Sequence, residues 1–262
     1  MARNRLTQKI LKRAIDDFAL RGLQQSEIDC LLEFSDGELS RFLSAAQQRV
    51  LSVPFAYITG EVEFYGRTFK IDERCYVPNK ETEQLVSVVL DYLHKKDSPC
   101  SVLDVGTGSG NIAITLKKEF PELKVSGSDV DLYTLEVARK NVERLGIDIQ
   151  LYHSNYVDGI SGRKPDVIIA DLPWGTVDDF LHAGGIKELE YMPEVSLFHK
   201  DGHLVAQKEF FQSILRKKWS PVIFFEHGTR YKDDITKIVP EGWNADFHTF
   251  GSYMVTMLRC SE

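Results

Sequence analysis

The stretch Val102–Gly110 reads VLDVGTGSG, and it decides the fold of the chain. The apolar residues at its start predict a short buried strand, and the glycines that follow lead into a predicted helix over residues 111–119. Glycine lets the backbone turn tightly and approach a ligand closely. A strand, a Gly-rich turn and a helix in this order begin a βαβ unit, so the sequence predicts an α/β fold on a parallel sheet.

The same alternation of strands and helices runs through the rest of the chain. The patterns predict helix 83–93, strand 101–105, helix 111–119, strand 123–128, helix 132–145, strands 148–152 and 166–170, helix 204–217, strand 221–226 and helix 231–238. Residues 246–250 and 253–259 predict a final antiparallel pair that closes one edge of the sheet. Alternating elements of this kind predict a Rossmann-like sheet covered by helices on both faces.

The N-terminal part of the chain has a helical period and no strand pattern. Apolar residues recur every four positions at Leu6, Ile10, Ala14 and Phe18. Ser35 and Glu38 form the capping-box pattern that precedes many helices. These features predict a small domain made of helices.

A hairpin pattern separates the helical part from the α/β part. Between Tyr57 and Ile71 the apolar period changes to two, with a glycine in the middle. We therefore predict three parts: an N-terminal helical domain over residues 1–54 that recognises substrate, a linker β-hairpin over 55–77, and a Rossmann-like domain over 78–262.

Composition and charge argue against several classes of protein. The net charge is −7, whereas non-specific nucleic-acid binding relies on clustered Lys and Arg, so no nucleic-acid partner is expected. No apolar run approaches the ~20 residues of a membrane span. The four cysteines are scattered without a C-x-x-C pair, which predicts no metal site and reduced thiols in a cytoplasmic protein.

The Gly-rich turn carries the pattern of a nucleotide-cofactor site. Its spacing is G-x-G-x-G, and position 111 is Asn, so the G-x-x-G end of the dinucleotide fingerprint is absent. This spacing, preceded by Asp104, fits S-adenosylmethionine better than a pyrophosphate cofactor. Asp104 can approach the ammonium group of that cofactor. Asp129, at the tip of the next strand, can accept hydrogen bonds from both ribose hydroxyls.

A further polar segment follows the third strand of this half. Asn155 can bond the adenine edge, and Tyr156 can cover the adenine face, because ligands of open α/β sheets bind at the carboxyl ends of the strands. The predicted cofactor-binding residues are therefore Asp104, Gly106, Thr107, Gly108, Gly110, Asp129, Asn155 and Tyr156.

The tetrad Asp171-Leu172-Pro173-Trp174 follows the predicted strand 166–170. It looks like an altered form of the Asn/Asp-Pro-Pro-aromatic motif of enzymes that methylate planar nitrogens. Such a nitrogen needs acceptors for its N–H groups and an aromatic face. Asp171 and the Leu172 carbonyl can be the acceptors, and Trp174 the face. These four residues are the predicted catalytic residues.

Several other segments, taken in order, carry a family resemblance over nearly the whole chain. They are Pro54–Gly60 (PFAYITG), Glu63–Gly66 (EFYG), Val77–Glu83 (VPNKETE), Pro193–Phe198 (PEVSLF) and Glu226–Gly228 (EHG). With the Gly-rich turn and the tetrad, they resemble the HemK/PrmC family, which methylates a glutamine side-chain amide of peptide release factors. The resemblance implies a class I S-adenosylmethionine-dependent methyltransferase with an N-terminal helical domain.

The sequence departs from the family pattern at the acceptor site. The family's Asn-Pro-Pro-Tyr is Asp171-Leu172-Pro173-Trp174, its Pro-Arg-Pro is Pro78-Asn79-Lys80, and the acid usual at its adenine site is Asn155. An anionic acceptor beside a large aromatic ring suits a cationic nitrogen such as a guanidinium, because carboxylates pair with guanidinium groups and Trp binds cations.

Three functions follow, in order of preference. The leading hypothesis is an N-methyltransferase for a guanidine or amine, such as that of arginine or a related small molecule. The alternative is methylation of a release-factor glutamine, with Asp171 a tolerated variant. The third is a cofactor-binding protein without turnover. Among the acidic residues, Glu81 is the best candidate for a second carboxylate near the substrate.

Overall fold

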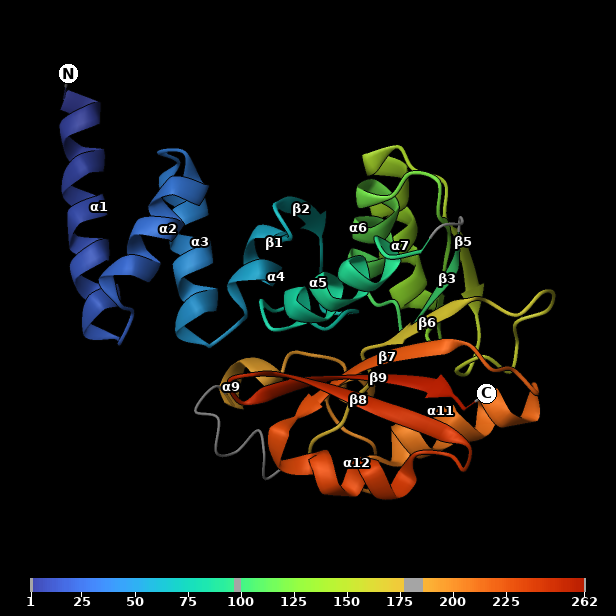
Figure 1. Ribbon diagram of the computed structural model, residues 1–262. Helices are drawn as coiled ribbons and strands as arrows, with labels where there is room; N and C mark the ends of the chain where they lie inside the picture. Colours follow the sequence, from blue (N-terminus) through green and yellow to red (C-terminus); the bar gives the residue numbers. More distant parts are fainter. Residues whose placement is uncertain (1, 97–99, 177–185, 262) are drawn as a thin grey trace. The chain divides into compact units, whose positions relative to one another are not determined.

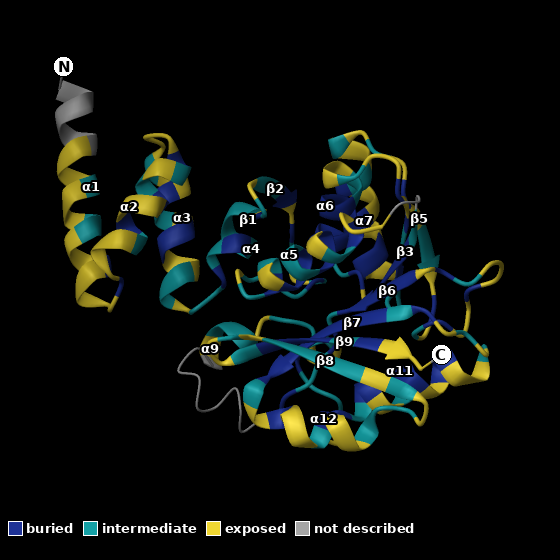
Figure 2. Cartoon of the chain, in the orientation of Figure 1, coloured by how far each residue is buried: buried dark blue, intermediate teal, exposed yellow. Residues whose placement is uncertain are grey.

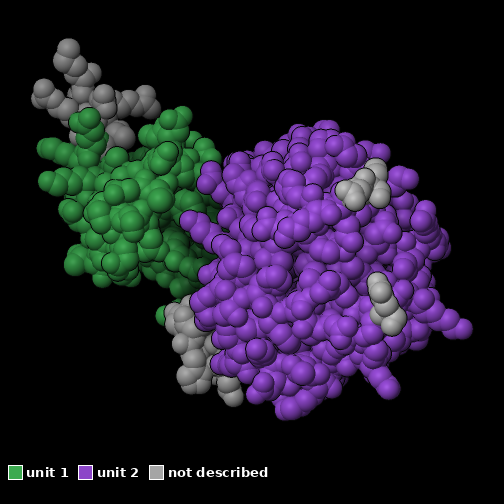
Figure 3. Space-filling model, in the orientation of Figure 1, with its two compact units in different colours: residues 1–60, 185–191 green, residues 61–184, 192–262 purple. Residues whose placement is uncertain are grey.

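The computed structural model describes residues 2–96, 100–176 and 186–261. The chain divides into two compact units (Figure 3). One unit contains residues 1–60 and 185–191, and the other contains residues 61–184 and 192–262. The predicted three-part division and the substrate-recognition role of residues 1–54 stay predictions.

The first unit is helical. Its elements are α1 (Ala2–Leu20), α2 (Gln25–Ser35), α3 (Leu39–Val50), α4 (Phe55–Thr59) and α9 (Ile186–Leu189). Phe18 and Phe42 pack edge to face in its core, with ring centroids 6.0 Å apart, beside the buried Ile28 and Leu31. Helices shorter than about 12–15 residues are marginal alone, and α2, α3, α4 and α9 are of this kind, so the shared apolar core stabilises the unit.

Two local predictions in this region are wrong. Ser35 does not cap a helix: it is the last residue of α2, and its hydroxyl donates to the carbonyl of Leu31 at 2.5 Å. The capping box belongs instead to Gln24 and Glu27, at the start of α2. The segment predicted as a hairpin, residues 55–77, begins with helix α4 (Phe55–Thr59), and the first strand follows this helix.

The second unit is built on a seven-stranded sheet (Figure 1). Its strands are β3 (Ser101–Val105), β4 (Lys124–Asp129), β5 (Gln150–His153), β6 (Val167–Ala170), β7 (Val222–Gly228), β8 (Trp243–Phe250) and β9 (Tyr253–Cys260). Their order is β5-β4-β3-β6-β7-β9-β8, parallel from β5 to β7, with β9 antiparallel to both of its neighbours. The predicted parallel sheet with an antiparallel edge pair is confirmed.

Helices cover both faces of this sheet (Figure 1). The helices are α5 (Thr82–Leu93), α6 (Asn111–Glu119), α7 (Leu132–Leu145), α10 (Glu194–Leu197), α11 (Val205–Arg216), the 3₁₀ turn η1 (Thr229–Tyr231) and α12 (Lys232–Ile238). One apolar core joins the sheet to α5 and α6, and a second joins it to α11 and α12. The central strands are accordingly buried almost throughout (Figure 2), as expected for parallel strands covered on both faces.

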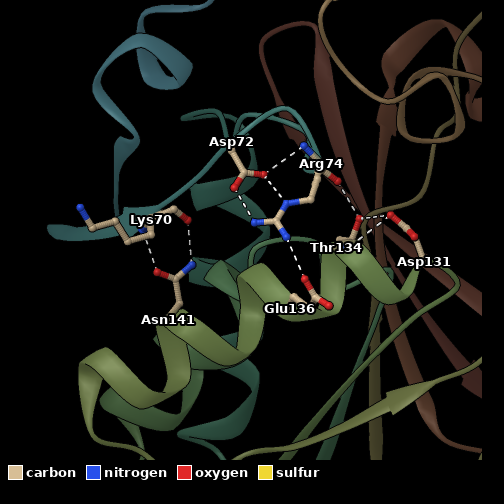
Figure 4. A network of polar contacts seen from close by, with 7 residues as sticks. All are labelled: Lys70, Asp72, Arg74, Asp131, Thr134, Glu136 and Asn141. Carbon is tan, nitrogen blue, oxygen red and sulfur yellow. Dashed lines mark hydrogen bonds and ion pairs between the residues drawn. The ribbon is translucent and has the colours of Figure 1, made fainter.

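The hairpin of β1 (Glu61–Phe64) and β2 (Arg67–Lys70) belongs to the second unit and is tied to α7. The buried Asn141 accepts a hydrogen bond from the backbone N–H of Lys70 at 2.7 Å, and its amide donates to the carbonyls of Lys70 and Ser109. Arg74 continues this network with ion pairs to Asp72 and Glu136 (Figure 4). The segment after the hairpin is therefore held beside the Gly-rich turn.

Among the described residues, no helix has both the length and the apolar character needed to span a membrane. The cytoplasmic location inferred from the cysteines stays a prediction.

Candidate active site

The Gly-rich turn, the segment of Asn155 and Tyr156, and the tetrad all lie at the carboxyl edge of the sheet. The chain runs outward from β3 through β4 to β5 in one direction, and through β6 to β7 in the other. Such a reversal of strand order leaves a crevice at the strand ends, where ligands of open α/β folds bind. Gly106 lies there with a φ of 73°, and a Cβ added to it would come within 3.2 Å of the Leu172 side chain. The Gly-rich turn and the tetrad are thus in contact.

Asp104 stabilises the Gly-rich turn through hydrogen bonds. It is fully buried, and its Oδ2 accepts hydrogen bonds from the Thr107 hydroxyl at 2.7 Å and the Ala113 N–H at 3.2 Å. Burial raises the pKa of Asp104 to about 7. Its Oδ1 has no hydrogen-bond partner among the described residues. A buried acceptor without a partner is unfavourable, so a donor from a bound cofactor would improve the site.

Asp129, at the end of β4, connects the Gly-rich turn to α7. Its two oxygens accept hydrogen bonds from the backbone N–H groups of Gly108 and Asp131, both at 3.0 Å. Desolvation raises its pKa. Each carboxylate oxygen has a further lone pair. Asp129 can therefore accept ribose hydroxyl groups while it holds the turn.

The two residues predicted at the adenine differ in placement. Asn155 is exposed, so its side chain is accessible to a ligand. Tyr156 is in the left-handed region at φ 49°, and its ring packs against Phe210 while its hydroxyl donates to Glu209 at 3.0 Å. Tyr156 is therefore held by α11, and its predicted place over the adenine face stays a prediction.

Asp171 is held by a chain of hydrogen bonds that begins at the start of α5. The Thr82 hydroxyl lies 3.1 Å from Asp171 Oδ2 and 2.9 Å from Asn79 Oδ1. Asn79 Oδ1 also accepts the Thr82 N–H at 2.9 Å, which identifies it as an acceptor. The Thr82 hydroxyl donates to Asp171 from a position that Asn79 fixes.

The other oxygen of Asp171, Oδ1, can accept a hydrogen bond from a ligand. Desolvation raises the pKa of Asp171 to about 6, and the hydrogen bond from Thr82 opposes this rise. The residue remains partly exposed to an incoming ligand.

Trp174 supplies the predicted aromatic surface. Its ring packs edge to face on Tyr231 and Tyr253, with centroids 5.8 and 6.2 Å away. Gly228 lies beneath it, where an added Cβ would approach the indole to 3.1 Å. The residue as a whole is partly exposed.

Two carbonyl groups of the tetrad accept hydrogen bonds from Gln207, a residue that was not predicted to belong to the site. This buried side chain on α11 donates from Nε2 to the carbonyls of Leu172 at 3.3 Å and Pro173 at 3.2 Å. Leu172 lacks the ring that fixes φ in proline. Gln207 therefore restrains by hydrogen bonds a backbone that the family restrains by a second proline. The Leu172 carbonyl keeps a second lone pair for a substrate N–H.

Gln207→Leu is expected to lower kcat/KM for methyl transfer about 10-fold, because two hydrogen bonds of about 0.5–1.5 kcal/mol each are lost from the acceptor loop. The cofactor Kd, measured by calorimetry, should change less than about twofold. Lys208→Ala, an exposed neighbour on the same helix, is the matched control. Unchanged kinetics in a folded Gln207→Leu variant would show that the tetrad needs no such restraint.

Two further acidic side chains, Glu226 and Glu81, lie close to one another, and Glu226 also lies close to Asp171. Glu226 on β7 is 3% exposed, and burial together with Asp171 and Glu81 raises its pKa to about 9. Glu81, the predicted second carboxylate, is only partly buried and precedes α5. Glu226 is the more deeply placed of the two. In the sequence, Glu226 is one of several glutamates that could supply a second carboxylate, and it lies in the Glu-His-Gly segment.

Comparison with known proteins agrees with this geometry. Residues 80–179 match the family model of the methyltransferase small domain. A release factor glutamine methyltransferase of Staphylococcus aureus is 31% identical over 78% of this chain and 74% of its own, and that of Bacillus cereus is 28% identical over 80% and 76%. A solved 16S rRNA N2 G1207 methyltransferase of T. thermophilus, in complex with AdoMet and guanosine, shares the fold. Its TM-score is 0.53 at 15% identity, over 77% of this chain and 50% of that one.

The fold and the site together define a class I S-adenosylmethionine-dependent N-methyltransferase. Within that class the chain belongs to the HemK/PrmC family of release factor glutamine methyltransferases. The comparisons favour the glutamine alternative over the leading hypothesis of a guanidine or small-molecule acceptor.

Proposed function

We propose that this enzyme methylates a glutamine side-chain amide of a peptide release factor. The observation that carries the proposal is the position of two acceptors, the Asp171 carboxyl group and the Leu172 carbonyl, beside the Gly-rich turn. Two acceptors match the two hydrogens of a primary amide. The names of the relatives point to the same acceptor.

Each part of the site has a task in this reaction. S-adenosylmethionine supplies an electrophilic sulfonium methyl group. Asp104, Asp129 and the Gly-rich turn would hold it, with Asn155 and Tyr156 at the adenine. Asp171 Oδ1 and the Leu172 carbonyl accept the two amide hydrogens and aim the nitrogen lone pair. Positioning of this kind is the main contribution an enzyme makes to such a displacement.

Methyl transfer forms one bond and breaks one bond. The amide nitrogen forms a bond to the methyl carbon, the carbon–sulfur bond breaks with its electron pair on sulfur, and the nitrogen loses one proton. The products are N-methylated glutamine, S-adenosylhomocysteine and a proton. The helical domain predicted over residues 1–54 is proposed to hold the release factor, and Glu81 to line the substrate entrance.

The test is incubation with methyl-labelled S-adenosylmethionine and, separately, a purified peptide release factor, its variant with the acceptor glutamine replaced, and free arginine. We expect label only on the unmodified release factor. Label on arginine and none on the release factor would overturn the proposal and restore the guanidine hypothesis. If S-adenosylhomocysteine forms but neither acceptor is labelled, the enzyme methylates a different nitrogen.

A further inference from the structure

The segment that follows β5 lies next to the proposed ribose site. Ser154 donates its backbone N–H to the carbonyl of Asp129 at 2.9 Å, and Asn155 and Tyr156 come directly after it. The Gly-rich turn is bonded to Asp129 from the β3 side, so the base of a bound nucleoside is expected on the β5 side. We call residues 154–157 the adenine loop. Its conformation should therefore affect the affinity for the cofactor.

Glu209 on α11 holds the adenine loop through Tyr156. Tyr156 has a φ of 49°, in the left-handed region that residues other than glycine rarely adopt. Its hydroxyl donates to Glu209 Oε2 at 3.0 Å. Burial and the Glu209 carboxylate raise the pKa of the Tyr156 phenol, which therefore keeps its hydrogen and donates it. This bond and the packing of the ring on Phe210 offset the cost of the backbone conformation.

His199 faces the same oxygen of Glu209. Its Nδ1 accepts the backbone N–H of Asp201 at 3.2 Å, so a neutral ring carries its hydrogen on Nε2. Nε2 lies 3.7 Å from Glu209 Oε2, which places a positive end of the ring toward the carboxylate. The preceding residue, Phe198, pairs with Gly175, which directly follows the tetrad. The Glu209 carboxylate is therefore oriented by a segment that is itself attached to the acceptor site.

We propose that Glu209 is a positioning residue for S-adenosylmethionine: its hydrogen bond to Tyr156 fixes the middle of the adenine loop in the form that receives the adenine. The two ends of the loop are fixed without Glu209. Ser154 is bonded to β4, and the Val157 N–H donates to Ser213 Oγ on α11 at 3.2 Å. Glu209 instead restrains the side chain between them. The inference rests on the cofactor part of the proposed function and is independent of the acceptor.

Calorimetric titration of S-adenosylmethionine, without any acceptor, tests this role. Glu209→Ala should raise the cofactor Kd about 10-fold, the effect of one lost hydrogen bond to a charged group. Glu209→Gln should stay within about threefold of wild type, because an amide oxygen also accepts the phenol hydrogen. Tyr156→Phe removes the same bond, so it should match Glu209→Ala, and the double variant should bind no more weakly than either. The matched control is Arg216→Ala, which removes an ion pair between α11 and Asp158, just beyond the loop, and should change Kd less than about twofold.

Steady-state kinetics separates positioning from general stability. In Glu209→Ala the KM for S-adenosylmethionine should rise with Kd, whereas kcat at saturating cofactor should stay within about threefold of wild type, because the acceptor groups of the tetrad are unchanged. An unchanged Kd in Glu209→Ala, additive losses in the double variant, or an equal loss in Arg216→Ala would each overturn the proposal. The expected Kd values without release-factor methylation would overturn only the proposed acceptor.

Discussion

Asp171→Ala is expected to lower kcat/KM for release-factor methylation about 10³-fold, the upper range for removal of one preorganised hydrogen-bonding group from a reaction centre. The variant removes the Oδ1 acceptor and the link to Thr82 in one step. The amide would then be held only by the Leu172 carbonyl, and its lone pair would no longer be aimed. Initial rates with labelled cofactor, over a range of release-factor concentrations, measure the effect.

Two controls make this result specific. The cofactor Kd of Asp171→Ala should stay within about threefold of wild type, because Asp171 is predicted to contact the acceptor and not the cofactor. Asp171→Asn should keep the glutamine activity. If both variants lose activity equally, a negative charge on Asp171 is required, and the guanidine hypothesis regains support.

Asp129→Ala is expected to weaken binding of S-adenosylmethionine about 100-fold. A carboxylate makes hydrogen bonds of about 1.5–3 kcal/mol, and one lost interaction of about 2.7 kcal/mol corresponds to this factor. The variant also frees the N–H groups of Gly108 and Asp131, which hold the Gly-rich turn. Calorimetric titration of the cofactor into the protein measures the change.

The matched control is Asp166→Ala. Asp166 also accepts hydrogen bonds from a backbone N–H and a hydroxyl, both of Ser101, but at the amino edge of the sheet. It should leave cofactor affinity unchanged even if it lowers thermal stability. Equal losses of affinity in the two variants would mean that the Asp129 effect is one of general stability.

The fold was predictable because its signals are local. Val102–Gly110 contains a strand, a turn and the start of a helix within nine consecutive residues, and the structure has these elements where they were expected. The edge pair β8–β9 was also evident from its period and its Gly251-Ser252 turn. The failure at Ser35 concerns the end of a helix. The failure at Phe55–Thr59 concerns a helix of only five residues, which is too short for a helical period to stand out.

The candidate site was predictable only in part. Residues that follow strands, such as Asp129 and Asp171, can be placed at one edge of a parallel sheet from the sequence alone. Gln207, on a helix far along the chain, reaches the tetrad only because α11 packs on β6 and β7 through their shared core. The position of Glu226 beside Asp171 likewise depends on strand register, which no local pattern encodes.

The sequence by itself determined the class of protein: local order of strands, glycines and acids specifies the methyltransferase sheet and its cofactor edge. Only the tertiary structure decided how Asp171 is used. The charge of a carboxyl group depends on burial, on hydrogen bonds and on neighbouring acids, and here these come from Thr82, Asn79 and Glu226, which lie far from Asp171 in sequence. The acceptor preference of the altered tetrad is therefore a property of the folded site.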